Sequence, residues 1–194
     1  MGEEAPIPEI DTARISLRLP PAGAAARVVR FLEANRERHA RFEPPRSPRF
    51  FTEEHWRARL AQSVEEWRAG TSLRLFAFLR GEADGPVVGR ISLAPIERGP
   101  FQSARLGYAV DAGHEGRGLM REALGAVAKH AFEVMGLHRL EANHDPANER
   151  SARLLRRAGF AVEGYARDYL FIGGAWRDHV LTALHDPRAA EPPP

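Results

Sequence analysis

The sequence predicts a mixed α/β (α+β) domain in which most of the sheet is antiparallel, and three observations support that prediction. Between residues 73 and 110, three short apolar runs are separated by turn-forming segments, as in a meander of antiparallel strands. At Gly116 the apolar period changes to that of a long helix, which implies one parallel crossover. Gly173-Gly174, between two later apolar runs, is typical of a hairpin turn. We expect about seven strands and about four helices.

In the first half of the chain, each element has its own local signal. Residues 13–19 alternate apolar and polar side chains, as a half-buried strand does. Two segments, 24–38 and 53–69, have helical spacing, and Thr52 followed by two glutamates fits the start of the second helix. The meander strands follow at 73–79, 87–93 and 104–110.

The second half alternates helices and strands. Gly136 is placed to end the long helix, and a strand follows at 138–143. Asp145-Pro146 offers an N-cap with proline in the first turn, which predicts a helix through residue 158. The strands of the terminal hairpin are expected at 160–172 and 176–184. We predict one domain over residues 11–185, flanked by flexible ends at 1–10 and 186–194.

Composition excludes several classes of function. With 194 residues, of which 43% are hydrophobic, the chain can form one core without stapling by disulfides or metals. Its 28 basic and 26 acidic residues give a net charge of +2, which does not favour nucleic-acid binding. The absence of cysteine excludes thiolate chemistry, and the eight histidines show no metal-binding spacing, so no metal is predicted. Without a leader-like N-terminus or a membrane-length apolar run, we expect a cytoplasmic protein.

The segment before the long helix has the composition of an anion site. A strand passes through a loop containing Gly113, Gly116 and Gly118 into the helix. Such a loop lets free N–H groups and the positive end of the helix dipole approach a pyrophosphate, although the glycines could also serve only to shape the turn. A dinucleotide-binding fold is disfavoured because Arg121 replaces the third glycine of its motif and because helices and antiparallel strands precede the loop.

The run from His114 to Met120 resembles the acyl-CoA pyrophosphate loop, Q/R-x-x-G-x-G/A, of the GNAT superfamily of N-acetyltransferases. In that comparison Gly118 is the first glycine and Met120 the second small position. Asn148 and Ser151 resemble the second cofactor-contacting segment of the superfamily. The resemblance implies the GNAT fold, with acetyl-CoA as co-substrate.

The C-terminal run, residues 163–184, is similar to the ribosomal-protein-alanine N-acetyltransferases of the RimJ/RimL branch. The resemblance covers nearly the full chain and is weakest before Leu73. It implies these cofactor contacts: Val110, Glu115, Gly116, Arg117, Gly118, Leu119, Met120, Arg121, Asn148 and Ser151. On the acceptor side it implies contacts from Tyr165, Asp168, Tyr169, Trp176 and His179, although packing on the sheet would explain each of these equally well.

Two positions depart from the family pattern. Glu115 stands where Gln or Arg is usual, and a carboxylate there opposes a pyrophosphate unless Arg117 or Arg121 neutralises it. The tyrosine that protonates the thiolate in some relatives would fall at Leu155, which cannot donate a proton. Ser151 is the nearest hydroxyl by motif position, although it could equally cap a helix.

The chemistry of acetyl transfer favours an α-amino acceptor. Attack on a thioester requires a neutral amine, a stabilised oxyanion and a proton for the thiolate. An α-amine with a pKa of about 7.7 to 8.0 is about a tenth neutral at pH 7, whereas a lysine is about a thousandth neutral or less. The resemblance implies a backbone N–H near Val110 as oxyanion donor. It also implies Glu141 as base, with His144 and Asp168 as weaker candidates, although Glu141 could equally be a surface acid.

These observations predict an enzyme that acetylates a protein N-terminus. The implied acceptor is an N-terminal alanine of a small-subunit ribosomal protein, either free or assembled in the ribosome. We expect the enzyme itself to be a monomer or a homodimer. One alternative is a small-molecule acetyltransferase acting on an aminoglycoside or polyamine, which would require a strongly acidic acceptor pocket. Another is a catalytically silent acyl-CoA-binding or ribosome-associated protein, which Glu115 and the missing tyrosine make conceivable.

Overall fold

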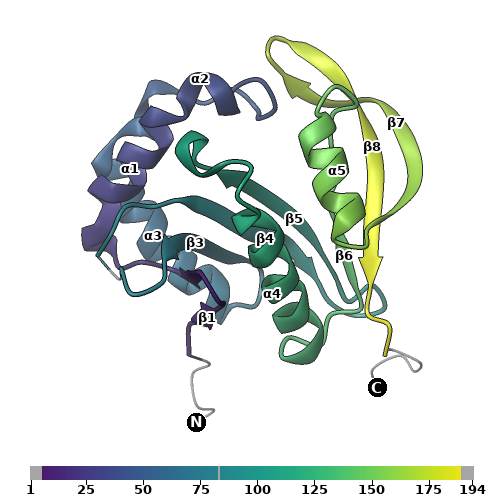
Figure 1. Ribbon diagram of the computed structural model, residues 1–194, viewed down its shortest axis with the longest axis horizontal. Helices are drawn as coiled ribbons and strands as arrows, with labels where there is room; N and C mark the ends of the chain where they lie inside the picture. Colours follow the sequence, from purple (N-terminus) through teal and green to yellow (C-terminus); the bar gives the residue numbers. More distant parts are fainter. Residues whose placement is uncertain (1–5, 83, 189–194) are drawn as a thin grey trace.

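The computed structural model describes residues 6–82 and 84–188, and a single mixed sheet runs through them (Figure 1). Its strand order is β1-β2-β3-β4-β5-β6-β8-β7, and every neighbouring pair is antiparallel except β5 and β6. The strands are β1 (Ile10–Asp11), β2 (Ile15–Arg18), β3 (Leu73–Leu79), β4 (Gly89–Glu97), β5 (Ser103–Val110), β6 (Arg139–Glu141), β7 (Ala161–Ile172) and β8 (Ala175–His185).

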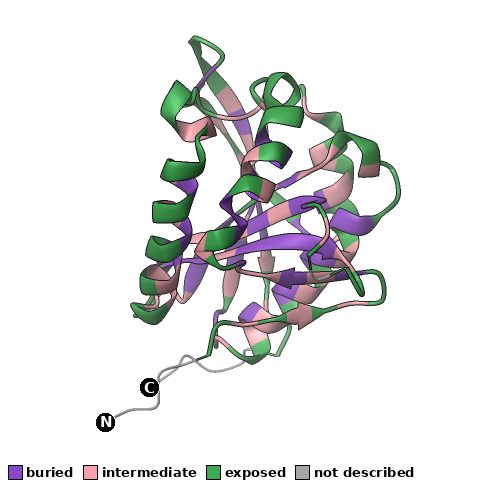
Figure 2. Ribbon diagram, turned by 90° about the vertical axis from the view of Figure 1, so that its left-hand side faces the viewer, coloured by how far each residue is buried: buried purple, intermediate pink, exposed green. Residues whose placement is uncertain are grey.

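Helices cover both faces of this sheet, because its strands alternate apolar side chains between two cores. On β3, Phe76 and Phe78 face a core shared with α1 and α3, whereas Leu75 faces a core shared with α4 and α5. Figure 2 shows buried residues in the strands and exposed residues on the outward sides of the helices. The helices are α1 (Ala25–Ala34), α2 (Arg36–His39), α3 (Glu53–Arg68), α4 (Leu119–Glu133) and α5 (Glu149–Arg157).

The predicted fold class, meander, parallel crossover and terminal hairpin are confirmed. The sheet has one strand more than expected among the described residues, because the short β1 pairs with β2. Ile10, placed in the expected flexible segment 1–10, is part of that pair, whereas residues 1–5 and 189–194 lie outside the described residues. No helix of the described chain is long and apolar enough to cross a membrane.

Two helix predictions were wrong in detail. The helix expected over 24–38 breaks at Asn35, a fully buried residue whose Nδ2 donates to the Phe31 carbonyl at 2.8 Å. The same side chain binds Asp111 and the N–H of Ala112, so a contact with a distant segment replaces helix continuation. The N-cap of α5 is Asn148 rather than Asp145, since Asp145 accepts from the Ala147 N–H in a preceding turn.

The parallel pair β5–β6 determines where the sheet opens. The two strands pair only at Ser103–Arg105 with Arg139–Glu141. Beyond that point β5 continues beside β4 to Val110, whereas the chain after β6 bonds to β8, where Ala142 donates to Thr182. A wedge therefore separates the end of β5 from the segment 142–144. The glycine loop and the start of α5 lie beside it.

Candidate active site

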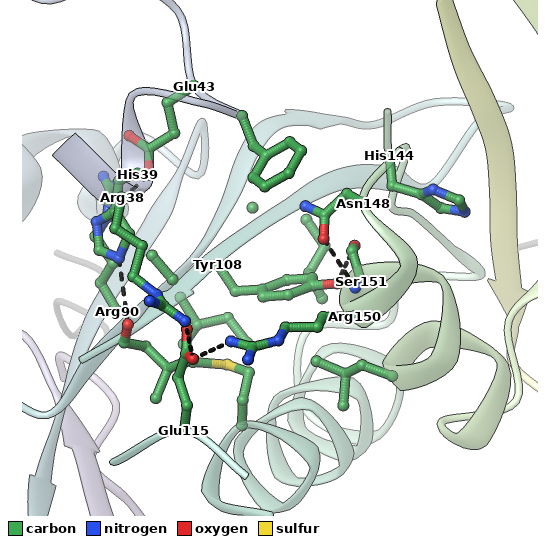
Figure 3. Close-up of a pocket in the computed structure, with 18 of the residues that line it drawn as sticks. Arg38, His39, Glu43, Arg90, Tyr108, Glu115, His144, Asn148, Arg150 and Ser151 are labelled. Carbon is green, nitrogen blue, oxygen red and sulfur yellow. Dashed lines mark hydrogen bonds and ion pairs between the residues drawn. The ribbon is translucent and has the colours of Figure 1, made fainter. Parts of the chain in front are cut away.

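A cleft of about 1370 Å³ occupies this wedge and reaches both faces of the sheet. On one side its lining comes from α2, the loop after α2, and strands β3 and β4. On the other side the lining comes from the glycine loop, α5 and β8. Figure 3 shows His39, Glu43 and Arg90 on one wall and Asn148 and Ser151 on the other, with Tyr108 between them.

The glycine loop forms an open amide cradle at the start of α4. Gly116 and Gly118 have φ values of +74° and +77°, in the left-handed region that favours glycine. Among the described residues, no group accepts a hydrogen bond from the backbone N–H groups of residues 116–121. Arg14 holds the loop by donating to the Arg117 carbonyl at 2.8 Å. These free amides at a helix N-terminus fit a pyrophosphate.

The carboxylate of Glu115 is neutralised, but not by the residues expected. Arg38 of α2 and Arg150 of α5 both donate to it, and in Figure 3 the two guanidinium groups converge on it. Burial alone would raise the pKa of Glu115, but the hydrogen bonds and charges of the two arginines outweigh burial and lower that pKa. The three side chains together carry one positive charge, so Glu115 does not oppose an anion in the cradle.

Tyr108 and Ser151 form a hydroxyl pair in the middle of the cleft. Their oxygens are 2.7 Å apart, and burial raises the pKa of Tyr108 to about 12, so its phenol is neutral at pH 7. Ser151 does not cap α5, since Asn148 Oδ1 accepts from the Ser151 N–H at 3.1 Å. Asn148 is thus the N-cap, and its Nδ2 points toward the cleft in Figure 3. Sequence reasoning missed Tyr108, whose only signal was a position on an apolar strand.

Comparison with known proteins agrees with this geometry. The family model described as acetyltransferase (GNAT) domain matches residues 14–161. The chain belongs to the GNAT acetyltransferase family. The [ribosomal protein uS5]-alanine N-acetyltransferase of Escherichia coli strain K12 is 36% identical over 188 residues, 96% of each chain.

Two solved structures resemble this GNAT acetyltransferase along nearly its whole length. The ribosomal-protein-S5-alanine acetyltransferase of Vibrio fischeri has a TM-score of 0.88 and 33% identity, covering 93% of this chain and 98% of that one. RimJ of Mycobacterium smegmatis, in complex with CoA-disulfide, has a TM-score of 0.84 and 28% identity, covering 95% of this chain and 89% of that one. With the family shown, acetyl-CoA is the expected acetyl donor of this chain.

The free edge of β5 presents backbone N–H groups to the cleft of this acetyltransferase. Asp111 donates its N–H to Val88 on the β4 side, so the N–H and carbonyl of Val110 point the opposite way, toward the wedge. The carbonyl of Val110 lies 3.2 Å from His39 Nε2, on the far wall. By the two-residue period of a strand, the N–H of Tyr108 faces the same way.

The structure does not bring two of the three candidate bases to the cleft. Glu141 is absent from the lining, because Arg139 holds its carboxylate at 2.8 Å and Arg105 approaches it at 4.0 Å. Asp168 lies in the hairpin with φ +48° and donates its N–H to Asp178. His144 does reach the lining, but its ring points away from the cleft centre in Figure 3, and its Nδ1 donates to the Asp145 carbonyl.

The expected acceptor-side residues divide into two groups. His179 is buried and lines the cleft, and Tyr169 packs on its ring with centroids 5.2 Å apart. Tyr165 and Trp176 lie on the exposed hairpin outside the lining, where Tyr165 donates to Asp178 and Trp176 contacts the ring of Phe171. The sequence similarity of the hairpin therefore marks both residues at the cleft and residues beyond it.

Proposed function

We propose that this chain transfers the acetyl group of acetyl-CoA to the α-amine of a protein N-terminus, its natural acceptor being the N-terminal alanine of a small-subunit ribosomal protein. The observation that carries the proposal is the cleft through the sheet, which joins an amide cradle on one side to an open wall on the other. The acceptor named for the Escherichia coli relative, similar along 96% of both chains, supports the choice of protein.

Each requirement of the reaction has a group in the cleft. Acetyl-CoA supplies the reactive thioester, and the backbone N–H groups of residues 116–121 would bind the pyrophosphate of its CoA moiety. Asn148 Nδ2, which points toward the cleft, would hydrogen-bond the pantetheine arm, and the N–H groups of Val110 and Tyr108, which face the wedge, would stabilise the developing oxyanion. As the new N–C bond forms and the C–S bond breaks, the neutral hydroxyl pair of Tyr108 and Ser151 delivers a proton to the thiolate, and the proton that the attacking nitrogen loses returns to the pair through water.

The proton of the ammonium needs no dedicated carboxylate in this proposal. Glu141 and Asp168 lie outside the cleft lining, and about a tenth of an α-amine is already neutral at pH 7. We therefore expect kcat/KM to rise with pH up to the pKa of the acceptor amine and then to level off. We call the side of the cleft opposite the glycine loop and α5 the acceptor wall, and Arg46, Arg74 and Arg90 line it. A cationic polyamine is therefore a poor alternative acceptor, because these positive charges would repel it.

The test is release of free CoA from acetyl-CoA with two peptides. One copies the alanine N-terminus of the small-subunit protein, and the other is the same peptide blocked at its α-amine and containing a lysine. Turnover of the first peptide alone, with the acetyl group located on the α-nitrogen by mass spectrometry, is the expected result. Equal turnover of both peptides would contradict the proposal. Acetyl-CoA binding without any turnover would favour a silent binding protein.

A further inference from the structure

Three arginines meet on the acceptor wall, away from the glycine loop. Arg74 of β3 lies opposite Ser92, and Arg90 of β4 lies opposite Phe76, so both point to the sheet face that carries α1 and α3. Arg46, from the loop after α2, extends over the ring of Phe50 at 4.7 Å. All three arginines line the cleft.

These guanidinium groups are incompletely satisfied. Arg90 pairs with Glu43, but its buried Nε has no hydrogen-bond partner among the described residues. Arg74 forms no hydrogen bond or ion pair with any described residue, and its Nε is also buried. A guanidinium charge partly withdrawn from water without a compensating acceptor is costly, and because Arg74 lines the cleft, an anion bound there would supply that acceptor and complete the cluster.

The charges around the cluster agree with this interpretation. Glu43 is the one carboxylate that lines this wall of the described cleft, against three guanidinium groups. The carboxylate of Glu66 also influences Arg74, but Arg59 and Ser72 already bind it, each at 2.8 Å. Burial, together with repulsion from Arg59, lowers the pKa of Arg74 to about 10.

The register of the strands locates the cluster relative to the transfer site. Arg74 is level with Gly107 on β5, three residues before Val110, and Arg90 is level with Ala109. At about 3.3 Å per residue, the row of Arg74 lies roughly 10 Å along the strand from Val110. An extended peptide whose amine lies at the end of β5 would bring its second to fourth side chains to this row.

We propose that Arg74, assisted by Arg46 and Arg90, binds a carboxylate of the acceptor, an aspartate or glutamate at the second to fourth residue of the peptide. This inference rests on the proposed function and narrows its substrate class to acidic protein N-termini. A bidentate contact from a guanidinium to a carboxylate is the strong, oriented hydrogen bond that such a cluster can provide.

The experiment uses pairs of peptides that begin with alanine and differ only by Glu or Gln at position 2, 3 or 4. For the wild-type protein, we expect kcat/KM to be about 10 to 100-fold higher for at least one Glu peptide than for its Gln partner. The Arg74→Met variant should reduce this ratio to less than about threefold, mainly through KM, and Arg74→Lys should retain part of it. Arg30→Met, on the exposed side of α1 outside the cleft, is the matched control and should keep the full ratio.

Several results would overturn the inference. Equal kcat/KM for every Glu and Gln pair would do so while leaving the proposed function intact, and this wild-type comparison does not depend on how any variant folds. A ratio that survives in Arg74→Met would exclude Arg74 as its source. A large rise in the KM for acetyl-CoA in Arg74→Met, with the peptide ratio unchanged, would assign the cluster to the cofactor. No turnover of any peptide would refute the proposed function together with the inference.

Discussion

Replacement of Gly118 by alanine tests the backbone of the amide cradle. The φ of +77° at Gly118 lies in the left-handed region, whereas Gly125, seven residues along in the middle of α4, is not among the residues with positive φ. A Cβ at Gly118 would come no closer than 3.5 Å to Arg14 Nη2, and at Gly125 it would meet nothing within 4 Å. The two substitutions therefore differ in backbone strain and not in steric crowding.

The two substitutions are expected to change the free energy of unfolding in opposite directions. In the left-handed region alanine costs about 1 to 2 kcal/mol, partly offset by a gain of about 0.4 to 1 kcal/mol from a stiffer unfolded chain. Gly118→Ala should thus lower the free energy of unfolding by about 1 kcal/mol, which is about 2 to 4 °C in Tm for a chain of this size. Gly125→Ala, in an exposed helix interior, should raise the free energy of unfolding by about the same amount.

Thermal and urea unfolding of both variants measure these changes in stability. Calorimetric titration measures the affinity of the cradle for acetyl-CoA. If the chain relieves the strain by turning its amides away from the ligand, 1 to 2 kcal/mol becomes about a 5 to 30-fold weaker Kd for Gly118→Ala. Gly125→Ala should bind as wild type. Equal stabilisation by both alanines, with unchanged acetyl-CoA affinity, would refute the assignment of Gly118 to a strained anion cradle.

Further substitutions test the remaining contacts. Ser151→Ala should lower kcat by about 10² to 10⁴-fold, the usual effect of a general acid, with little change in the Kd for acetyl-CoA; an unchanged kcat would remove the hydroxyl pair from proton transfer. Glu141→Gln should change kcat/KM by less than about threefold between pH 6 and 9, because the carboxylate lies outside the cleft, and a loss of about 10² or more would restore it as the base. Asn35→Ala should destabilise the fold by about 1 to 3 kcal/mol in urea unfolding, since it removes the buried amide that binds the Phe31 carbonyl, Asp111 and the Ala112 N–H; a loss below about 0.5 kcal/mol would show that water replaces the amide. The contribution of the ionised Glu115 carboxylate to stability should be lost below about pH 4.5, as the pH falls through its lowered pKa. The Tm of Glu115→Gln should therefore fall less steeply with decreasing pH than the Tm of the wild type.

Signals that depend on a few neighbouring residues predicted the structure well. Thr52 caps α3 by accepting from the His55 N–H, and Gly173-Gly174 turns the terminal hairpin. Gly116 and Gly118 take the left-handed conformation that the motif required. Each of these outcomes follows from backbone geometry within one turn, which the local sequence controls directly.

By itself the sequence determined the fold class, the order of the elements and the position of the glycine loop, because apolar periods and turn residues act locally. Only the tertiary structure decided which side chains meet in the cleft. Tyr108 finds Ser151, which is 43 residues away, and Glu115 finds Arg38 and Arg150 rather than its neighbour Arg117. Strand alternation says which face of the sheet a side chain takes, but whether that face opens into the cleft depends on how distant elements pack, and Glu141 lies outside the cleft lining for this reason.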